Sequence, residues 1–146
     1  MPEVIIVNNE DEAGELYAKC VADLIRNKPN AVLGLATGSS PLAAYKQLAK
    51  KVKEEHIDVS QVRGFALDEY IGLPLTHPES YHSTIHRTVV EPLGLNPDAV
   101  HVPGDVLDGA PLEDGDLIRN AGPDYDAAIE AAGGIDVQIL GIGTDG

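Results

Sequence analysis

The sequence is poor in basic residues and in cysteine, and both shortages exclude classes of protein. Ten Lys and Arg residues stand against 24 Asp and Glu residues, so the formal net charge at pH 7 is −14. A charge of this sign repels the phosphates of nucleic acids and of anionic membranes, and we expect neither as a partner. The single cysteine, Cys20, cannot form an internal disulfide and suits a reducing compartment.

Long apolar runs are lacking as well. No stretch reaches the ~18 consecutive apolar residues of a membrane-spanning helix, and no basic leader precedes the first apolar run, at residues 3–7. These absences predict a soluble, cytoplasmic protein that is not exported. Of the 146 residues, 43% are hydrophobic, which is enough to build the core of one domain over residues 1–146.

The apolar residues fall into alternating strand and helix patterns. Short apolar runs predict strands at residues 3–7, 31–36, 62–67, 100–102 and 135–141. Helical periodicity predicts helices at residues 13–25, 41–52, 80–90 and 124–132. The stretch 95–123 is rich in Gly, Pro and Asp, and we expect most of it to be loop.

Strands that are apolar on both faces and separated by helices are typical of a parallel sheet covered on both sides. The predicted fold class is therefore α/β, with a doubly wound, mostly parallel, Rossmann-like sheet and right-handed crossovers. On the first helix, Cys20 shares the apolar stripe with Leu16 and Leu24. We expect a buried thiol that acts as a small hydrophobe and not as a nucleophile.

Three polar segments directly follow predicted strands, where the ligand site of an open parallel sheet lies. The first consists of Thr37, Gly38, Ser39 and Ser40. A glycine turn followed by hydroxyl groups and a helix start is suited to hold a phosphate, although the nucleotide-binding glycine motifs lack their key residues here. The alternative is an ordinary turn, with Ser39 or Ser40 as helix N-cap and Pro41 as the first helical residue.

The second segment begins with two adjacent acids, Asp68 and Glu69, followed by Tyr70. A partly desolvated carboxylate at a strand end has a raised pKa and can serve as a general base, and Asp68 is the first candidate for this role. Glu69 and Tyr70 are supporting candidates. The alternative is that Asp68 caps the next turn and Glu69 is solvated.

The third segment is the glycine-rich turn 141–146, which contains Asp145. A domain seldom stops on such a turn directly after an interior strand, so we expect the natural chain to continue past Gly146. His82 and His86 are four residues apart, but they lack the H-E-x-x-H pattern and a third ligand. We therefore predict no metal site.

The three segments carry a family resemblance when they are taken together. ATGSSP at 36–41, LDEYIGLPLTHPESYHSTIHR at 67–87 and GIGTDG at 141–146 resemble the glucosamine-6-phosphate deaminase family, also called glucosamine/galactosamine-6-phosphate isomerases. The middle element is the most specific, and the resemblance covers essentially the whole chain. It implies an aldose–ketose isomerisation coupled to deamination, which turns glucosamine 6-phosphate and water into fructose 6-phosphate and ammonia without metal or organic cofactor.

The resemblance also implies roles for individual residues. Asp68 is similar to the base that enolises the substrate at C2, and the loop 37–40 is similar to the part that holds the phosphate. Asp145 belongs to a ring-opening group that also needs a histidine and a glutamate, which would follow Gly146. Because these two residues are not in the sequence, we expect the 146-residue chain to be inactive by itself.

Two other functions remain open at this stage. A 6-phosphogluconolactonase has a related fold, but its relatives usually carry DER where this chain has DEY, so Tyr70 favours the deaminase. A non-catalytic sugar-phosphate sensor would normally carry a DNA-binding segment upstream of the first strand. The expected partner in all three cases is a small sugar phosphate, and the sequence leaves open whether a homo-oligomer forms or an effector binds.

Overall fold

Four parallel strands form one sheet in the computed structural model, which describes residues 1–105 and 115–146. The strands are β1 (Val32–Leu35), β2 (Arg63–Ala66), β3 (Val100–His101) and β4 (Val137–Gln138), in the spatial order β3-β2-β1-β4. β1 pairs with both β2 and β4, and β2 pairs with β3, in parallel in each case. The predicted parallel α/β sheet is confirmed.

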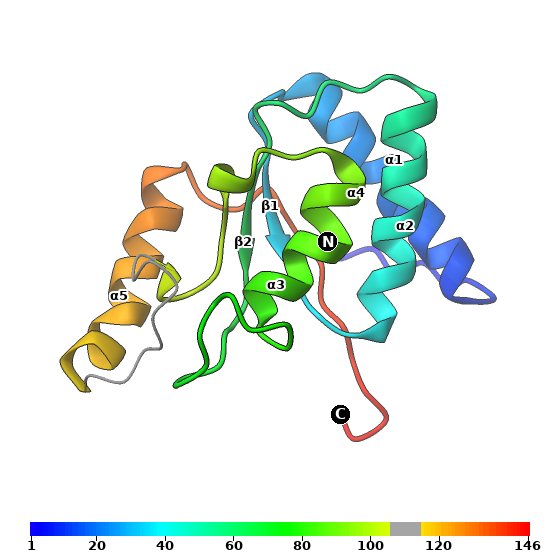
Figure 1. Cartoon of the computed structure of the whole chain (residues 1–146). Coiled ribbons are helices and arrows are strands. Elements are labelled where there is room, and N and C mark those ends of the chain that lie inside the picture. The colour runs from blue at the N-terminus through cyan, green and yellow to red at the C-terminus, as the bar shows by residue number, and fades with distance from the viewer. Residues whose placement is uncertain (106–114) are drawn as a thin grey trace.

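Helices cover both faces of the sheet, as a doubly wound fold requires. They are α1 (Glu10–Asn27), α2 (Ser39–Glu54), α3 (Tyr81–Ile85), the π-helical turn η1 (His86–Val90), α4 (Glu91–Leu93), the short 3-10 turn η2 (Pro97–Ala99) and α5 (Gly115–Ala131). Figure 1 shows α5 alone on one side of the strands and α1 to α4 on the other. None of the helices in the described residues has the length and apolar content that a bilayer crossing needs.

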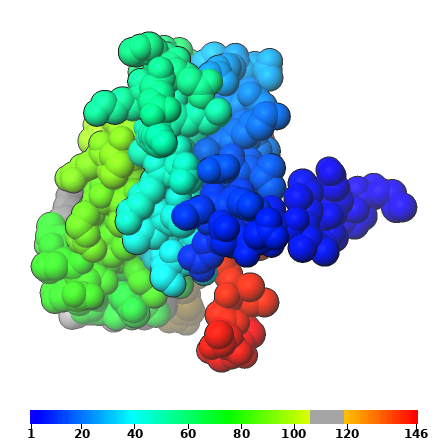
Figure 2. All heavy atoms as spheres, turned by 90° about the vertical axis from the view of Figure 1, so that its right-hand side faces the viewer, coloured from blue at the N-terminus to red at the C-terminus, as the bar shows by residue number. Residues whose placement is uncertain are grey.

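Residues 1–7 form no strand, so the predicted strand at 3–7 is wrong. Val4, Ile5 and Ile6 are 84%, 59% and 92% exposed. Figure 2 shows this segment, in blue, projecting away from the body of the molecule. β-branched residues provide only a propensity, and a strand forms when a free sheet edge accepts its backbone. No described strand pairs with this segment.

The buried face of α1 is rotated from the predicted stripe, and Cys20 is exposed rather than buried. Small residues make this face, namely Gly14, Ala18 and Ala22, together with Val21 and Ile25. They allow α2 to approach closely: a Cβ on Gly14 would lie 3.2 Å from the Ala43 carbonyl oxygen. Helical periodicity in the sequence predicted that the large apolar side chains of α1 would be buried, whereas the packing against α2 buries small ones.

The last helix and the last strand also differ from the predictions. α5 begins at Gly115, well before the predicted start at 124, and contains Pro123 in its interior. A proline removes one helical hydrogen bond, but α5 packs on the sheet through Tyr125, whose ring centroid lies 5.6 Å from that of Phe65. β4 covers only Val137–Gln138 of the predicted 135–141. Part of the predicted loop 95–123, residues 106–114, lies outside the described residues.

The carboxylate of Asp136 attaches β4 to β1. It accepts a hydrogen bond of 2.8 Å from the Val32 backbone N–H and forms an ion pair of 2.9 Å with Lys28 Nζ. These two contacts lower the pKa of Asp136, the backbone bond being the larger cause. Further along, the Ile139 N–H donates a hydrogen bond of 3.1 Å to the Gly34 carbonyl, so the chain that follows β4 starts beside the end of β1.

Candidate active site

The carboxyl ends of β1, β2 and β4 meet at one edge of the sheet, around a cavity of about 360 Å³. The cavity is lined by residues 36–41, by Leu67 and Asp68, and by residues 140–143. All three segments singled out in the sequence thus contribute to one site. This is the arrangement expected for ligand binding by an open parallel sheet.

The loop after β1 is shaped by Gly38. Its φ of 116° and ψ of 174° lie in a region that side chains rarely adopt, and it is the N-cap of α2. The alternative with Ser39 or Ser40 as N-cap and Pro41 as the first helical residue is wrong, because the helix already begins at Ser39. Gly38 has no side chain with which to cap this end, so it offers the first N–H groups of α2 no side-chain acceptor.

The start of this loop is clamped by a tyrosine from α2. The Tyr45 hydroxyl donates a hydrogen bond of 2.6 Å to the Ala36 carbonyl and accepts one of 2.9 Å from the Ala36 N–H. Tyr45 is 2% exposed, so this clamp lies in the core. It sets the direction in which the chain enters Thr37 and Gly38.

Asp68 lies at the cavity, one residue beyond the last ladder hydrogen bond of β2. That bond joins the Leu67 N–H to the Leu35 carbonyl at 3.1 Å and keeps the ends of β1 and β2 side by side. Partial burial raises the pKa of Asp68, and the neighbouring negative charge of Glu69 raises it further. Both effects make the carboxylate a stronger base, as the role predicted for it needs.

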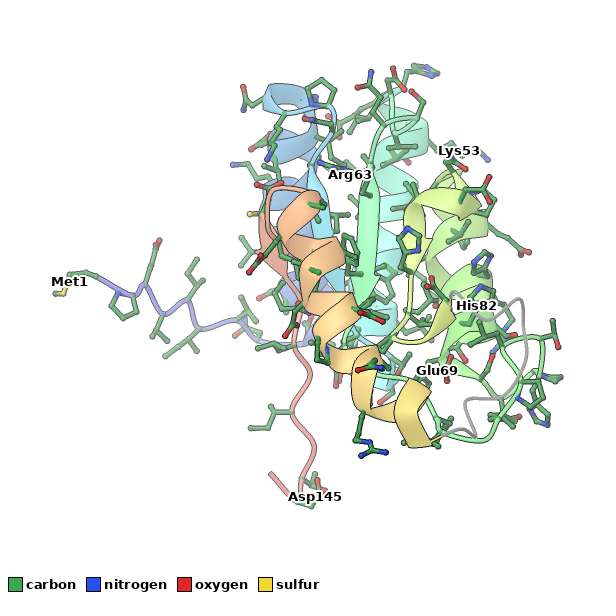
Figure 3. The ribbon with its side chains drawn as sticks, turned by 90° about the vertical axis from the view of Figure 1, so that its left-hand side faces the viewer. Met1, Lys53, Arg63, Glu69, His82 and Asp145 are labelled. Atoms are coloured by element: carbon green, nitrogen blue, oxygen red, sulfur yellow. The ribbon has the colours of Figure 1, made fainter. Side chains whose placement is uncertain are left out.

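Glu69 caps the beginning of α3. Its carboxylate accepts hydrogen bonds from the backbone N–H groups of Tyr70 (2.8 Å), Tyr81 (2.9 Å) and His82 (2.8 Å). Figure 3 shows Glu69 beside the helix that carries His82. The alternative that Glu69 is merely solvated is wrong. This cap attaches α3 to the end of β2 and brings Tyr81, which the sequence analysis did not single out, next to Tyr70.

Asp145 is not brought into the cavity. It lies on an exposed tail whose tip is labelled in Figure 3, away from the body of the molecule. Gly141 and Gly143 of the same turn do line the cavity. The structure therefore brings Asp68 and the loop 37–40 to one cavity but leaves Asp145 outside it.

His82 and His86 stack on each other, with ring centroids 4.3 Å apart. Burial lowers the pKa of His86, and the neighbouring His82 lowers it further, so the neutral form of the His86 ring is favoured. Among residues 1–105 and 115–146, no group of three or more His, Cys, Asp or Glu side chains could hold a metal ion.

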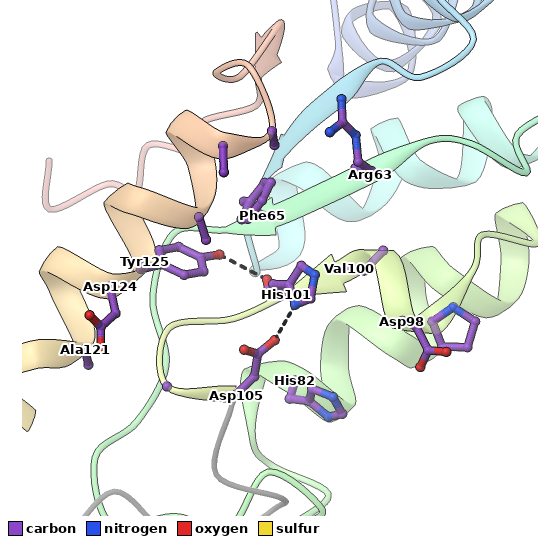
Figure 4. Close-up of a pocket in the computed structure, with 15 residues that line it drawn as sticks. Arg63, Phe65, His82, Asp98, Val100, His101, Asp105, Ala121, Asp124 and Tyr125 are labelled. Carbon is purple, nitrogen blue, oxygen red and sulfur yellow. Dashed lines mark hydrogen bonds and ion pairs between the residues drawn. The ribbon is translucent and has the colours of Figure 1, made fainter. Parts of the chain in front are cut away.

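A larger cavity of about 720 Å³ lies between α5 and the sheet (Figure 4). The Tyr125 hydroxyl lies 2.7 Å from the Ala66 carbonyl oxygen and 3.1 Å from that of His101. His101 Nδ1 is 2.8 Å from the Asp105 carboxylate. None of the predicted site residues lines this cavity. The strand ends and Asp68 converge at the smaller cavity, which is therefore the candidate site.

The fold and this strand-end cavity define an α/β protein with an open parallel sheet and a cavity at its carboxyl edge. Residues 8–146 match the family described as glucosamine-6-phosphate isomerases/6-phosphogluconolactonase. The chain belongs to this family.

Two curated relatives are glucosamine-6-phosphate deaminases. The protein from Bifidobacterium longum is 82% identical over 146 residues, which is 100% of this chain and 54% of the relative. The protein from Streptomyces coelicolor is 48% identical over 144 residues, 99% of this chain and 52% of the relative. The chain thus spans about half the length of the curated relatives it matches.

Solved structures show the same fold. A monomeric glucosamine-6-phosphate deaminase superposes with a TM-score of 0.84 at 30% identity, over 97% of this chain and 56% of that protein. A 6-phosphogluconolactonase from Thermotoga maritima superposes with a TM-score of 0.69 at 22% identity, over 97% and 59%. At that identity the second likeness shows the fold alone.

Proposed function

We propose that this chain provides the phosphate loop and the general base of an enzyme that converts glucosamine 6-phosphate and water into fructose 6-phosphate and ammonia. One observation carries the proposal: Thr37 to Ser40 and Asp68 line the same cavity. The relatives at 82% and 48% identity, both glucosamine-6-phosphate deaminases, support this choice of substrate. The lactonase alternative is supported by the similar fold of a solved 6-phosphogluconolactonase. No described feature favours a sensor.

The proposed chemistry follows from this arrangement. Removing a proton from the carbon beside an open-chain aldehyde needs a positioned base, which typically contributes ~10²–10⁴-fold in rate. A phosphate held at Gly38 and Ser39 fixes the far end of the substrate, so that its C2 lies toward the Asp68 carboxylate. Asp145 would take part in ring opening, as the carboxylate that orients a histidine outside the 146 residues.

The phosphate loop can be tested by titrating the chain with inorganic phosphate. We expect saturable changes in the amide NMR signals of Gly38, Ser39 and Ser40, because these N–H groups lie at the uncapped start of α2. Sodium chloride at equal ionic strength should not reproduce them. If these signals stay unchanged while others respond, the assignment of the loop is wrong.

A pair of glycine variants provides a matched control for this titration. Gly38 and Gly94 both have positive φ, 116° and 74°, and an added Cβ would have no contact closer than 3.8 Å at either. Gly38→Ala should reshape the loop and abolish the phosphate response. Gly94→Ala also places a side chain at a positive φ, in the less strained left-handed helical region (φ 74°, ψ 32°) at the end of α4, and should leave the response intact.

The 146-residue chain itself should release no measurable ammonia from glucosamine 6-phosphate. Asp145 is exposed and outside the cavity, and the histidine and glutamate proposed to act with it are not in the sequence. The measurement is a coupled ammonia assay on the purified chain, with a full-length relative as positive control. Turnover at the rate of that relative would contradict both this expectation and the role given to Asp145.

A further inference from the structure

The hydrogen bonds of β1 alternate between its two neighbours up to Ala36. The Leu35 carbonyl accepts a bond of 3.1 Å from the Leu67 N–H, on the side of β2. The Gly34 carbonyl accepts a bond of 3.1 Å from the Ile139 N–H, on the side of β4. Because the bonds of a parallel ladder follow one another at even spacing, the alternation directs the N–H and carbonyl of Ala36 to the side of β4.

The chain after β4 turns away from β1 at this point. Figure 1 shows it, in red, leaving the sheet. The Ile139 carbonyl, which a continued ladder would offer to β1, is bound instead by Gln138 Nε2 at 2.7 Å. Residues 140–143 and 36–41 both line the candidate cavity. The cavity therefore lies where β1 and the chain after β4 separate.

The Tyr45 hydroxyl provides both bonds that the separated ladder does not. It accepts a hydrogen bond of 2.9 Å from the Ala36 N–H and donates one of 2.6 Å to the Ala36 carbonyl. Ala36 and Tyr45 are only 6% and 2% exposed, so these polar groups depend on each other and not on bulk water. Burial raises the pKa of Tyr45 to about 12, so the hydroxyl keeps the proton that it donates.

Tyr45 also belongs to the helix whose start forms part of the proposed phosphate loop. α2 begins at Ser39, and Tyr45 lies further along its buried face. The two bonds therefore connect α2 back to the end of β1, and the residues between them, Thr37 and Gly38, are held at both ends. A loop that is ordered in advance loses less conformational freedom when it binds a ligand.

We infer that Tyr45 is a positioning residue: its hydroxyl takes the place of a neighbouring strand at Ala36 and so holds the loop 37–40 in the shape that a phosphate needs. This inference rests on the proposed function, because it explains how the proposed phosphate loop is kept in place. Tyr45 is not among the described residues that line the cavity, so it acts through the loop and not on the ligand.

Amide hydrogen exchange of the unaltered chain gives the first test. The Ala36 N–H should be protected to within about tenfold of the Gly34 N–H, which lies inside the ladder. The N–H of Ile142, on the exposed tail, should exchange far faster. Exchange of Ala36 as fast as that of Ile142 would mean that the bond to Tyr45 does not hold in solution, and the inference would be wrong.

Tyr45→Phe removes the hydroxyl and keeps the buried ring. We expect the dissociation constant for inorganic phosphate, measured on the amides of Gly38 and Ser39, to rise roughly two- to tenfold. The matched control is Tyr17→Phe, which deletes the same atom from a tyrosine on α1 whose ring centroid lies 6.4 Å from that of Tyr45. This control should change the constant by less than about twofold.

A second control separates positioning from a merely structural role. Val52 is 8% exposed and lies toward the far end of α2, so Val52→Ala weakens the same helix away from the loop. It should lower the urea midpoint, as Tyr45→Phe does, but leave the phosphate constant within about twofold of wild type. All titrations contain the same concentration of sucrose, which favours the folded state, so that each variant is measured folded.

The kinetic constants provide a further readout. In a chain continued past Gly146 to the length of its relatives, Tyr45→Phe should raise KM for the sugar phosphate by the same factor as the phosphate constant and leave kcat within about twofold. That pattern means weaker phosphate binding. A lower kcat with unchanged KM would overturn the inference, because the loss would then lie in the chemical step.

The outcomes distinguish the inference from the proposed function. If the wild-type loop responds to phosphate and Tyr45→Phe binds it equally well, the inference is wrong and the phosphate loop stands. If Tyr17→Phe or Val52→Ala weakens binding as much as Tyr45→Phe, general loss of packing explains the effect, and the inference is also wrong. If the wild-type loop does not respond at all, the phosphate loop and the inference fail together.

Discussion

Asp68→Asn is expected to lower kcat by about 10²–10⁴-fold in a chain continued past Gly146 to the length of its relatives. An amide keeps nearly the same shape as the carboxylate but cannot accept the proton from the substrate carbon. Binding of an unreactive substrate analogue should stay within a few-fold of wild type, because the group acts in the transition state. Exchange of solvent deuterium into the carbon skeleton should fall in parallel with product formation.

The control for this variant is Asp23→Asn on α1. Asp23 is exposed and makes a surface ion pair of 3.5 Å with Arg26, and such pairs contribute little to stability. Asp23→Asn should therefore leave kcat and KM unchanged, although it alters the net charge by the same amount. Normal turnover and normal deuterium exchange in Asp68→Asn would show that Asp68 is not the base.

Leu35→Ala is expected to lower the free energy of unfolding by about 2–5 kcal/mol. Leu35 is 1% exposed and belongs to the central core cluster. A Cβ on Gly64 would lie only 2.8 Å from Leu35 Cδ1, so the leucine packs directly over β2. Truncation would leave a cavity beneath the strand end that carries Thr37. Urea denaturation of the purified chain, followed by circular dichroism, measures the change.

Leu140→Ala makes the same truncation at a residue that is 71% exposed. Its effect on the free energy of unfolding should stay within about 0.5 kcal/mol, as for surface substitutions in general. Equal losses for the two variants would contradict the burial difference between β1 and the tail that follows β4.

The sequence predicted the two inner strands of the sheet, β1 and β2, because the apolar runs that form them are local patterns. Residues 31–36 and 62–67 are apolar on both faces, and the structure buries β1 and β2 within them. The site could be anticipated in part, because polar residues that follow parallel strands must gather at one edge. Thr37, Gly38 and Asp68 lie there as expected.

Other features depended on partners that local patterns do not reveal. The run at 3–7 has strand composition but no described strand accepts it, and the exposure of Cys20 follows from the small residues that α1 turns toward α2. Glu69 had the same sequence signal as Asp68. The two acids differ because the start of α3 lies against one and the open cavity against the other.

The sequence by itself determined which residues are buried in β1 and β2, where the chain turns at Gly38, and which motifs carry the family resemblance. These features depend on hydrophobicity and backbone geometry over a few residues. Only the tertiary structure decided that Asp68 and the loop 37–40 share one cavity and that Asp145 lies outside it. Thr37 and Asp68, which line this cavity together, are 31 positions apart in the chain. Whether such distant residues meet depends on how whole helices and strands pack, which periodicity in the sequence does not report.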